Sequence, residues 1–282
     1  MPPAEFAIPK FEELYPNIKV EFMRIEDYWN MLLVRHAGGA APDVQRNIDM
    51  RFGPMLLRGA LRPLTEYIND PVDGVDLSDF HSVGIQGVTH DGEIWGLPQD
   101  ICARSILLYN MDMFDEAGLP YPDETWTWDD LYEAAKKLTK PDKSQYGFLA
   151  ALHNQEGFYN FIYQNGGTVI TPDKKSGYDD PRTIEAMEFY VKFVKEGLSP
   201  LIFGDAERAE AMQNGLCAMG FFGSWNLSGF AANEYMAENF DVTILPAAPN
   251  GERASLQRSW ICHSTEYQEC GCSMEMGRIP CF

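Results

Sequence analysis

The alternation of helical and extended segments is the feature that most limits what this chain can fold into. Phe6 to Tyr15 and Asp27 to Ala37 have the apolar spacing of amphipathic helices, whereas Ile18 to Phe22 alternates as a strand does. Ala41 to Val44 begins a short buried strand, and a further helix follows near Phe52. This order is typical of crossover units on a mostly parallel sheet, so we expect an α/β protein.

The same alternation continues along the rest of the chain. The further predicted strands are Ser105–Tyr109, Tyr146–Ala150, Leu216–Phe222 and Phe240–Leu245, and a hairpin turn is predicted at His90–Glu93. The further predicted helices are Asn110–Ala117, Trp128–Leu138, Phe158–Asn165, Pro181–Gly197, Ala206–Asn214 and Trp225–Ala232. A chain of 282 residues is long for a single core. We therefore expect two lobes, residues 1–109 and 110–245, with residues 246–282 returning to the first.

Charge and motifs exclude several classes of function. The formal net charge of −20 repels nucleic acid and anionic membrane surfaces, but it does not exclude a neutral ligand. The sequence contains no G-x-S-x-G motif, phosphate loop or dinucleotide fingerprint, so we predict neither an enzyme nor a cofactor. No secretion signal or membrane-spanning run is visible, which taken literally predicts a cytoplasmic protein.

A series of short motifs carries a family likeness. In chain order the motifs are Phe11-Glu12-Glu13-Leu14-Tyr15-Pro16-Asn17-Ile18-Lys19-Val20, Gly38-Gly39, Ala41-Pro42-Asp43-Val44, Gly96-Leu97-Pro98, Leu108-Tyr109-Asn110, Phe114-Asp115-Glu116-Ala117-Gly118, Pro122, Thr125-Trp126-Thr127-Trp128-Asp129-Asp130-Leu131, Asn165-Gly166-Gly167 and Gly223-Ser224-Trp225. In this order and spacing the chain resembles the family 1 extracellular solute-binding proteins, relatives of the maltose-binding protein. The likeness runs from about residue 6 to residue 255.

The resemblance implies the type II periplasmic-binding-protein fold, in which hinge strands join two α/β lobes. It implies a monomer that holds a sugar or oligosaccharide between the lobes and delivers it to the permease subunits of an ABC importer, without catalysis or a cofactor. Members of the family are periplasmic or cell-surface lipoproteins, with an export signal and a first β-strand ahead of the helix at Phe6. We therefore expect the first lobe to be incomplete at its N-terminus.

The last 22 residues, Ile261 to Phe282, have no helical or strand period. Back-translated with assumed codons and read one base later, they give FAIPQNTKNVDAAWKWAEFLA, which resembles the strand, turn and helix of the family. We therefore expect a frameshift near Leu256, and a fold that is incomplete at both ends and in one alternative binds nothing. A zinc site is the other interpretation of this tail, but its Cys-x-Cys spacing is not that of the usual zinc knuckle. The residues concerned are Cys262, His263, Cys270 and Cys272.

Ligands of open α/β sheets bind at the carboxyl ends of strands, and four loops of this chain qualify. The candidate ligand-binding residues in these loops are Asn47 and Asp49, Asp100, Gln155, Glu156, Phe158 and Tyr159, and Gly223, Ser224 and Trp225. A carboxylate such as Asp100 could accept hydrogen bonds from two sugar hydroxyls. Trp225 is the strongest candidate by its family position, since an indole can stack on a pyranose. The alternatives are solvated loops for the polar residues and core packing for Phe158 and Tyr159.

Other conspicuous residues are assigned to structure. Asp129 and Asp130 could be taken for the carboxylate pair of a glycosidase, but adjacent helical side chains point apart and would not flank one bond. The remaining tryptophans and isolated cysteines are expected to pack in the interior: Trp29, Trp95, Trp126, Trp128, Cys102 and Cys217.

Overall fold

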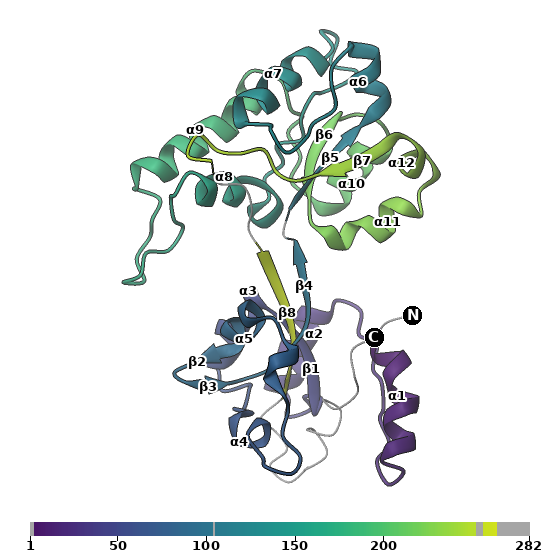
Figure 1. Ribbon diagram of the computed structural model, residues 1–282, viewed down its shortest axis with the longest axis vertical. Helices are drawn as coiled ribbons and strands as arrows, with labels where there is room; N and C mark the ends of the chain where they lie inside the picture. Colours follow the sequence, from purple (N-terminus) through teal and green to yellow (C-terminus); the bar gives the residue numbers. More distant parts are fainter. Residues whose placement is uncertain (1–2, 104, 252–255, 264–282) are drawn as a thin grey trace. The chain divides into compact units, whose positions relative to one another are not determined.

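Two strands carry the chain between two separately packed units of the computed structural model (Figure 1), which describes residues 3–103, 105–251 and 256–263. The first unit comprises residues 1–101 and 258–282, and the second comprises residues 102–257. The chain passes from one unit to the other within β4 (Leu97–Ala103) and returns within β8 (Leu256–His263). The predicted boundaries at residues 109–110 and 245–246 both lie inside the second unit.

The first unit is built from short helices around a small sheet. Its helices are α1 (Pro3–Leu14), α2 (Tyr28–Ala37), α3 (Asp49–Leu57), α4 (Thr65–Ile68), the 3₁₀ turn η1 (Leu77–Asp79) and α5 (Ser82–Val88). Its strands, besides β4 and β8, are β1 (Val44–Ile48), β2 (Thr89–His90) and β3 (Glu93–Ile94). The sheet has the order β1-β8-β4, and β1 runs antiparallel to β8. The predicted hairpin is confirmed, since β2 pairs antiparallel with β3. Asp91 and Gly92 form the turn between the two strands, and both have the positive φ angles that a tight hairpin turn requires.

Two strand predictions in this unit are wrong. Ile18 to Phe22 forms no strand; instead the amide of Val20 donates to the Glu12 carboxylate at 2.9 Å. Alternation favours a strand but does not supply the neighbour that a strand needs, and none of the described residues pairs with this segment. Conversely, β8 extends through Ile261 to His263, which were expected to lack regular structure, because the β1 backbone pairs with them. The rest of that tail lies outside the described residues.

The core of the first unit lies between its helices and the sheet. Its buried apolar side chains come mainly from α2, α3 and the segments that follow: Leu32, Phe52, Met55, Ala60, Leu61 and Val88, with Leu64 and Ile68 beside them. α2 precedes β1 in the sequence and α3 follows it. Burial of their shared apolar surface holds the two helices together.

The second unit surrounds a sheet of order β6-β5-β7. Its strands are β5 (Ile106–Asn110), β6 (Met219–Phe222) and β7 (Phe240–Thr243). Its helices are α6 (Met111–Ala117), α7 (Trp128–Leu138), the π-helical turn η2 (Asn154–Phe158), α8 (Tyr159–Gln164), α9 (Pro181–Lys195), α10 (Asp205–Gln213), the 3₁₀ turn η3 (Ser224–Asn226), α11 (Leu227–Ala231) and α12 (Glu234–Asn239).

The expected mostly parallel sheet is only partly present. Both β6 and β7 pair antiparallel with β5. The crossover pattern survives next to β6, where Tyr146 and Leu149 form parallel bridges with Cys217 and Gly220. The helices between these two segments make the connection that parallel strands require.

Aromatic side chains fill the core of the second unit. Trp128 is 3% exposed and its ring stacks on Phe189 with 4.9 Å between centroids, while Trp126 packs against the same core. Their assignment to packing is therefore confirmed. Phe161 stacks on Phe221 with 5.4 Å between ring centroids, within the separation that aromatic pairs prefer. This core fixes α8 and α9 against β6, the strand that leads into the candidate site.

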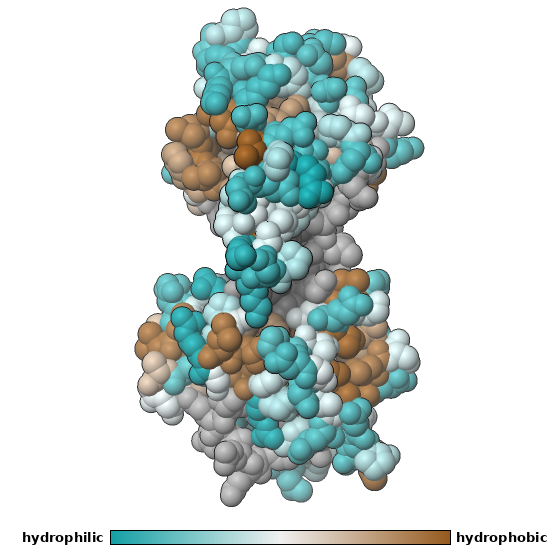
Figure 2. Space-filling view, turned by 90° about the vertical axis from the view of Figure 1, so that its left-hand side faces the viewer, coloured by the Kyte–Doolittle hydropathy of each residue, from teal (hydrophilic) through white to brown (hydrophobic). Residues whose placement is uncertain are grey.

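The surface is largely hydrophilic, with hydrophobic patches on both units on the face drawn in Figure 2. In the second unit, Leu152, Leu201 and Phe203 are each more than half exposed, and the amide of Leu152 donates to the carbonyl of Ile202 at 3.0 Å. These apolar side chains therefore lie on two neighbouring segments outside the core. None of the helices in the described parts of the chain is long and apolar enough to span a membrane.

Candidate functional site

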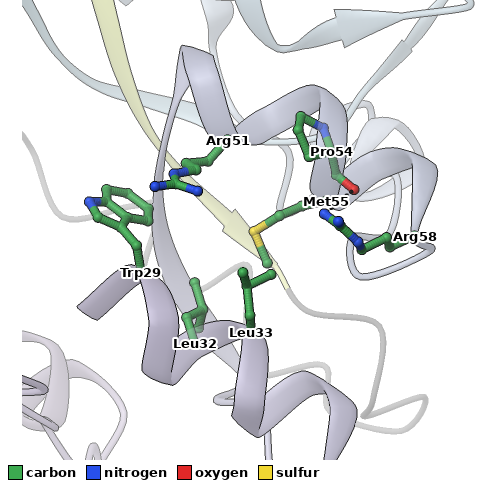
Figure 3. Close-up of a pocket in the computed structure, with 7 residues that line it drawn as sticks. All are labelled: Trp29, Leu32, Leu33, Arg51, Pro54, Met55 and Arg58. Atoms are coloured by element: carbon green, nitrogen blue, oxygen red, sulfur yellow. Dashed lines mark hydrogen bonds between the residues drawn. The ribbon is translucent and has the colours of Figure 1, made fainter. Parts of the chain in front are cut away.

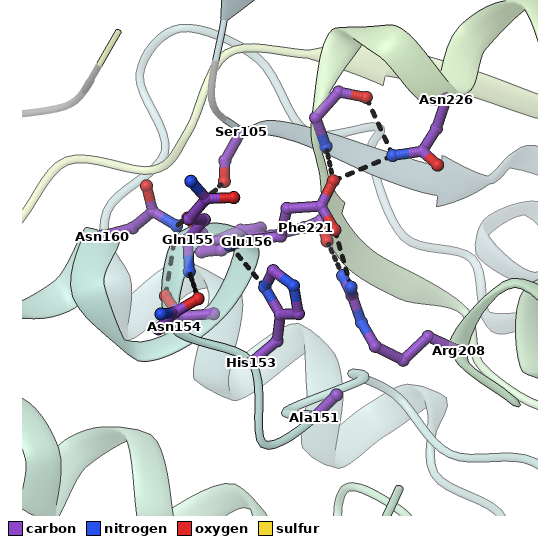
Figure 4. A network of polar contacts seen from close by, with 12 residues as sticks. Ser105, Ala151, His153, Asn154, Gln155, Glu156, Asn160, Arg208, Phe221 and Asn226 are labelled. Carbon is purple, nitrogen blue, oxygen red and sulfur yellow. Dashed lines mark hydrogen bonds and ion pairs between the residues drawn. The ribbon is translucent and has the colours of Figure 1, made fainter. Parts of the chain in front are cut away.

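Two of the four predicted ligand loops meet in the second unit (Figure 4). The turn η2 carries Gln155 and Glu156, and the turn η3 begins directly after Gly223 at the end of β6. The loops are 67 residues apart in sequence, yet the amide of Gly223 donates to a carboxylate oxygen of Glu156. The structure therefore joins these two loops into one candidate site.

Glu156 lies at the centre of this contact network. Its Oε2 accepts from Nη1 of Arg208 at 2.6 Å, and its Oε1 accepts from the Gly223 amide and from Nδ2 of Asn226 at 2.8 Å. Glu156 is only 6% exposed. The sequence predicted a ligand-contacting carboxylate here, whereas the structure shows a buried one whose two oxygens hold the neighbouring segments.

Arg208 extends from α10 to complete the network. It is 3% exposed, and its Nη2 donates to the carbonyl of Phe221 at 3.0 Å. Its guanidinium also lies 5.0 Å from the ring centroid of Phe222. Buried charges are stable only when paired and hydrogen-bonded, and the pair with Glu156 meets that condition. The pair contributes no net charge to the site.

Trp225 is the exposed group of the site. Its side chain is 42% exposed, and its indole lies so close to Gly223 that a Cβ there would be 2.2 Å from the ring. Glycine is therefore required for this approach of ring and backbone. Ser224, between them in sequence, is half-buried. The tryptophan thus presents a partly free aromatic surface on a backbone that Glu156 holds.

Gln155 contributes an unpaired donor. It is 7% exposed, and its Nε2 has no hydrogen-bond partner among the described residues. Its backbone carbonyl accepts from Nδ2 of Asn160 at 2.8 Å and from Oγ of Ser105 at 3.3 Å, which fixes the turn. A buried amide donor without a partner costs free energy, and such groups in native proteins call for an explanation.

Phe158 and Tyr159 are half-buried at the start of α8. The Phe158 ring packs against the core, with its centroid 6.3 Å from that of Tyr190. Tyr159 bonds to Tyr178, whose pKa is raised to about 12, chiefly by burial and then by that hydrogen bond. Both rings pack against the core, as the alternative interpretation expected, and Tyr159 also bonds to Tyr178.

The predicted residues of the first unit are placed differently from the expectation. Residues 45–48 continue β1 and form no loop, because β8 pairs with them as far as Ile48. Strand alternation turns Asn47 inward, where it is 0% exposed and its Nδ2 lies 3.6 Å from Sδ of Met55. Asp49 begins α3 and Asp100 lies in β4, but their side chains are outside the described residues.

Sequence reasoning missed a hollow in the first unit (Figure 3). It is a small surface hollow, and the guanidinium of Arg51 lies 5.7 Å from the Trp29 ring. The lining comes from α2 and α3: Trp29, Leu32, Leu33, Arg51, Pro54, Met55 and Arg58. Trp29 was assigned to packing. Nothing in its local pattern marks it, because the hollow depends on a contact with Arg51 of the later helix α3.

The family model of the bacterial extracellular solute-binding proteins matches residues 3–267. The chain belongs to this family. The match continues past Ser255, where the motif likeness was expected to stop. It confirms the predicted family, and no feature of it tests the expected truncation or frameshift.

This solute-binding protein is similar in sequence to two oligosaccharide-binding proteins of Bacillus subtilis. The galactooligosaccharide-binding protein of Bacillus subtilis is 26% identical over 267 residues, which are 88% of this chain and 58% of that protein. The arabinooligosaccharide-binding protein of the same organism is 23% identical over 180 residues, 59% of this chain and 40% of that protein. The chain thus spans about three fifths of the first of these relatives and less of the second.

Solved structures confirm the α/β solute-binding fold. An ABC substrate-binding protein from Listeria monocytogenes, in complex with cycloalternan, is 25% identical and superposes with a TM-score of 0.81, covering 98% of this chain and 70% of that one. An ABC transporter solute-binding protein from Thermotoga lettingae, bound with α-D-tagatose, has a TM-score of 0.80 at 24% identity and covers 98% and 72% of the two chains. The second likeness shows the fold alone.

No metal centre is found in the described part of this solute-binding protein, since no group of three histidine, cysteine or acidic side chains is placed to hold an ion there. The tail residues considered for zinc, Cys262 to Cys272, lie outside the described side chains. Of the candidate ligand residues, the structure gathers Gln155, Glu156 and the segment from Gly223 to Trp225 in the second unit.

Proposed function

We propose that this chain captures a sugar or oligosaccharide between its two lobes and delivers it to the permease of an ABC importer, without catalysis. The observation that carries the proposal is the half-exposed Trp225 indole, fixed to a buried network that also contains the unpaired amide donor of Gln155. Family membership supports it, as do relatives named for galactooligosaccharides and arabinooligosaccharides and a similar structure that holds cycloalternan.

The chemistry of the second unit suits a neutral saccharide. The indole of Trp225 offers an apolar face for the C–H groups of a pyranose ring. The half-buried hydroxyl of Ser224 can bond to the hydroxyl groups of a sugar, which both donate and accept hydrogen bonds. The ion pair between Glu156 and Arg208 adds no net charge to the site, which suits a neutral ligand. A ring with hydroxyl groups is the ligand that uses each of these features.

The first unit would contribute aromatic and charged side chains of α2 and α3. Trp29 supplies a second aromatic surface, and the guanidinium of Arg51 can donate to ligand oxygens. Asp49 and Asp100 remain predicted contacts. Each unit thus has an aromatic group beside polar groups.

The proposed mechanism is hinge closure. A ligand that bonds to both lobes favours the closed form by its differential affinity for the two forms. The closed monomer would then dock on the permease subunits outside the cytoplasm, in the periplasm or as a surface lipoprotein. Nothing in this cycle requires a bond in the sugar to break.

A thermal-shift screen with maltotetraose, galactotriose, cycloalternan and tagatose tests the proposal. At a ligand concentration 100 times the dissociation constant, binding to the folded form adds about 2.7 kcal/mol of stability. A receptor shows this stabilisation for at least one saccharide and leaves the saccharide intact. Release of a smaller sugar would indicate the glycosidase alternative, and the absence of any shift would favour a non-binding fragment.

A further inference from the structure

We propose that Arg208 is a positioning residue for ligand binding, which acts through Glu156 to fix the aromatic platform of Trp225 and does not touch the ligand. The inference rests on the proposed function, because it assigns a role to a residue behind the same site. Arg208 lies in α10, outside all four loops that the sequence singled out.

Arg208 connects three segments that the chain brings from different places. Its Nη1 bonds to Glu156 in η2, and its Nη2 bonds to the carbonyl of Phe221 at the end of β6. The planar guanidinium holds these two acceptors in a fixed relation. The other oxygen of Glu156 accepts from the Gly223 amide and from the Asn226 side chain, so a series of contacts leads from Arg208 to the backbone before Trp225 and to the side chain that follows it (Figure 4).

A role in positioning the site explains why this ion pair is buried better than a contribution to stability does. A buried ion pair often stabilises a fold no more than apolar side chains of the same volume would. By contrast, a binding site loses affinity when its supporting residues let it move by about 1 Å. Trp225 is 42% exposed and packs against Gly223, so any shift of that backbone moves the ring.

Lysine cannot replace Arg208 in this role. A lysine keeps the positive charge, but its ammonium is a point charge without the rigid fork that reaches two acceptors. Arg208→Lys therefore separates charge from geometry. Arg182→Lys is the matched control, since Arg182 pairs with Asp180 in the same unit but on the surface, with 61% of its side chain exposed.

The first arm of the test needs no ligand. The full 282-residue chain labelled with 5-fluorotryptophan gives one ¹⁹F resonance for each of its six tryptophans, and Trp225→Phe assigns the one of interest. In Arg208→Lys we expect the Trp225 resonance to shift or broaden while the resonance of the buried Trp128 stays in place. In the control Arg182→Lys we expect both resonances to stay in place. An unchanged Trp225 resonance in the folded variant would overturn the inference. If Arg208→Lys does not fold, Glu156→Gln tests the same resonance.

The second arm measures affinity for the best ligand among maltotetraose, galactotriose and cycloalternan by calorimetry. Arg208→Lys should weaken binding at least fivefold in the native background but less than twofold when Trp225 is phenylalanine, because its effect passes through the indole. Equal losses in both backgrounds would contradict the inference. If the native chain binds none of the three, the proposed function fails, and the fluorine spectra still decide the role of Arg208.

Discussion

Gly223 is the residue at which packing leaves the least freedom, because the Trp225 ring occupies the space that a Cβ would take. We expect Gly223→Ala to displace the indole, weaken saccharide affinity at least tenfold and destabilise the second unit by about 1–3 kcal/mol, the usual effect of overpacking. Calorimetric titration and chemical denaturation measure the two effects.

Gly229 in α11 is the control for that substitution. Nothing lies within 4 Å of a Cβ built on it, so Gly229→Ala should leave affinity unchanged and raise stability by about 0.5–1 kcal/mol through helix propensity. Equal affinities in Gly223→Ala and Gly229→Ala would show that the indole position is irrelevant to binding.

Trp225 itself should matter for affinity and little for stability. Because 42% of its side chain is exposed, we expect Trp225→Ala to change the free energy of unfolding by less than about 1 kcal/mol. Its affinity for the saccharide should fall at least tenfold, and Trp225→Phe should lie between the two proteins because a smaller ring stacks less. Native affinity in Trp225→Ala would show that the indole does not contribute to saccharide binding.

Tyr109 gives the second unit a dependence on alkaline pH. Burial, followed by the charge of Asp241 and the hydrogen bond to it, raises the pKa of Tyr109 to about 12, above the value near 10 of an exposed tyrosine. The folded form therefore retains a proton that the unfolded form loses. The resulting stability is complete below pH 10 and is lost as the pH rises towards 12. Denaturation between pH 9 and 11.5 should show a steeper loss in the native chain than in Tyr109→Phe, and parallel losses would contradict this.

At the scale of elements, the pair of Glu156 and Arg208 joins η2 to α10. Glu156→Ala leaves a buried guanidinium without its carboxylate, so we expect it to destabilise the second unit by about 3–5 kcal/mol in chemical denaturation. Glu133→Ala removes an exposed pair with Lys136 and should leave the denaturation midpoint unchanged. Similar midpoints for the two variants would indicate that the buried pair is not a structural connection.

The longer helices were predictable from local sequence, whereas α4, α5 and α12 were not predicted and strand pairing could not be. The bounds of α7 agree with the prediction, since its signals are local: an apolar stripe and a capping box between Thr127 and Asp130. Ile18 to Phe22 has the alternation of a strand, and its failure to pair depends on the rest of the fold. For the same reason β1 extends to Ile48, because β8 bonds to it from more than 200 residues away.

Two of the four predicted ligand loops meet in the structure, but their contacts could not be predicted. Gln155 and the segment from Gly223 to Trp225 were identified because they follow predicted strands or precede a helix. That Glu156 is turned inward could not be predicted, because its partner Arg208 lies 52 residues away in an ordinary amphipathic pattern. Asn47 was misplaced because its inward direction follows from the register of β1.

At the scale of the whole molecule, the chain consists of two units that β4 and β8 connect. Each unit has its own buried core, as hinge motion of two bodies would require. The proposed function requires this independence, because a ligand held by one unit alone would not bias a hinge.

Calorimetric titration of the purified 282-residue chain with maltotetraose, galactotriose and cycloalternan, followed by chromatography of the saccharide, tests the central claim most directly. The account predicts saturable binding of at least one saccharide at a single site, with the sugar recovered intact. Heats that never saturate with any of them, or recovery of cleaved sugar, would contradict it.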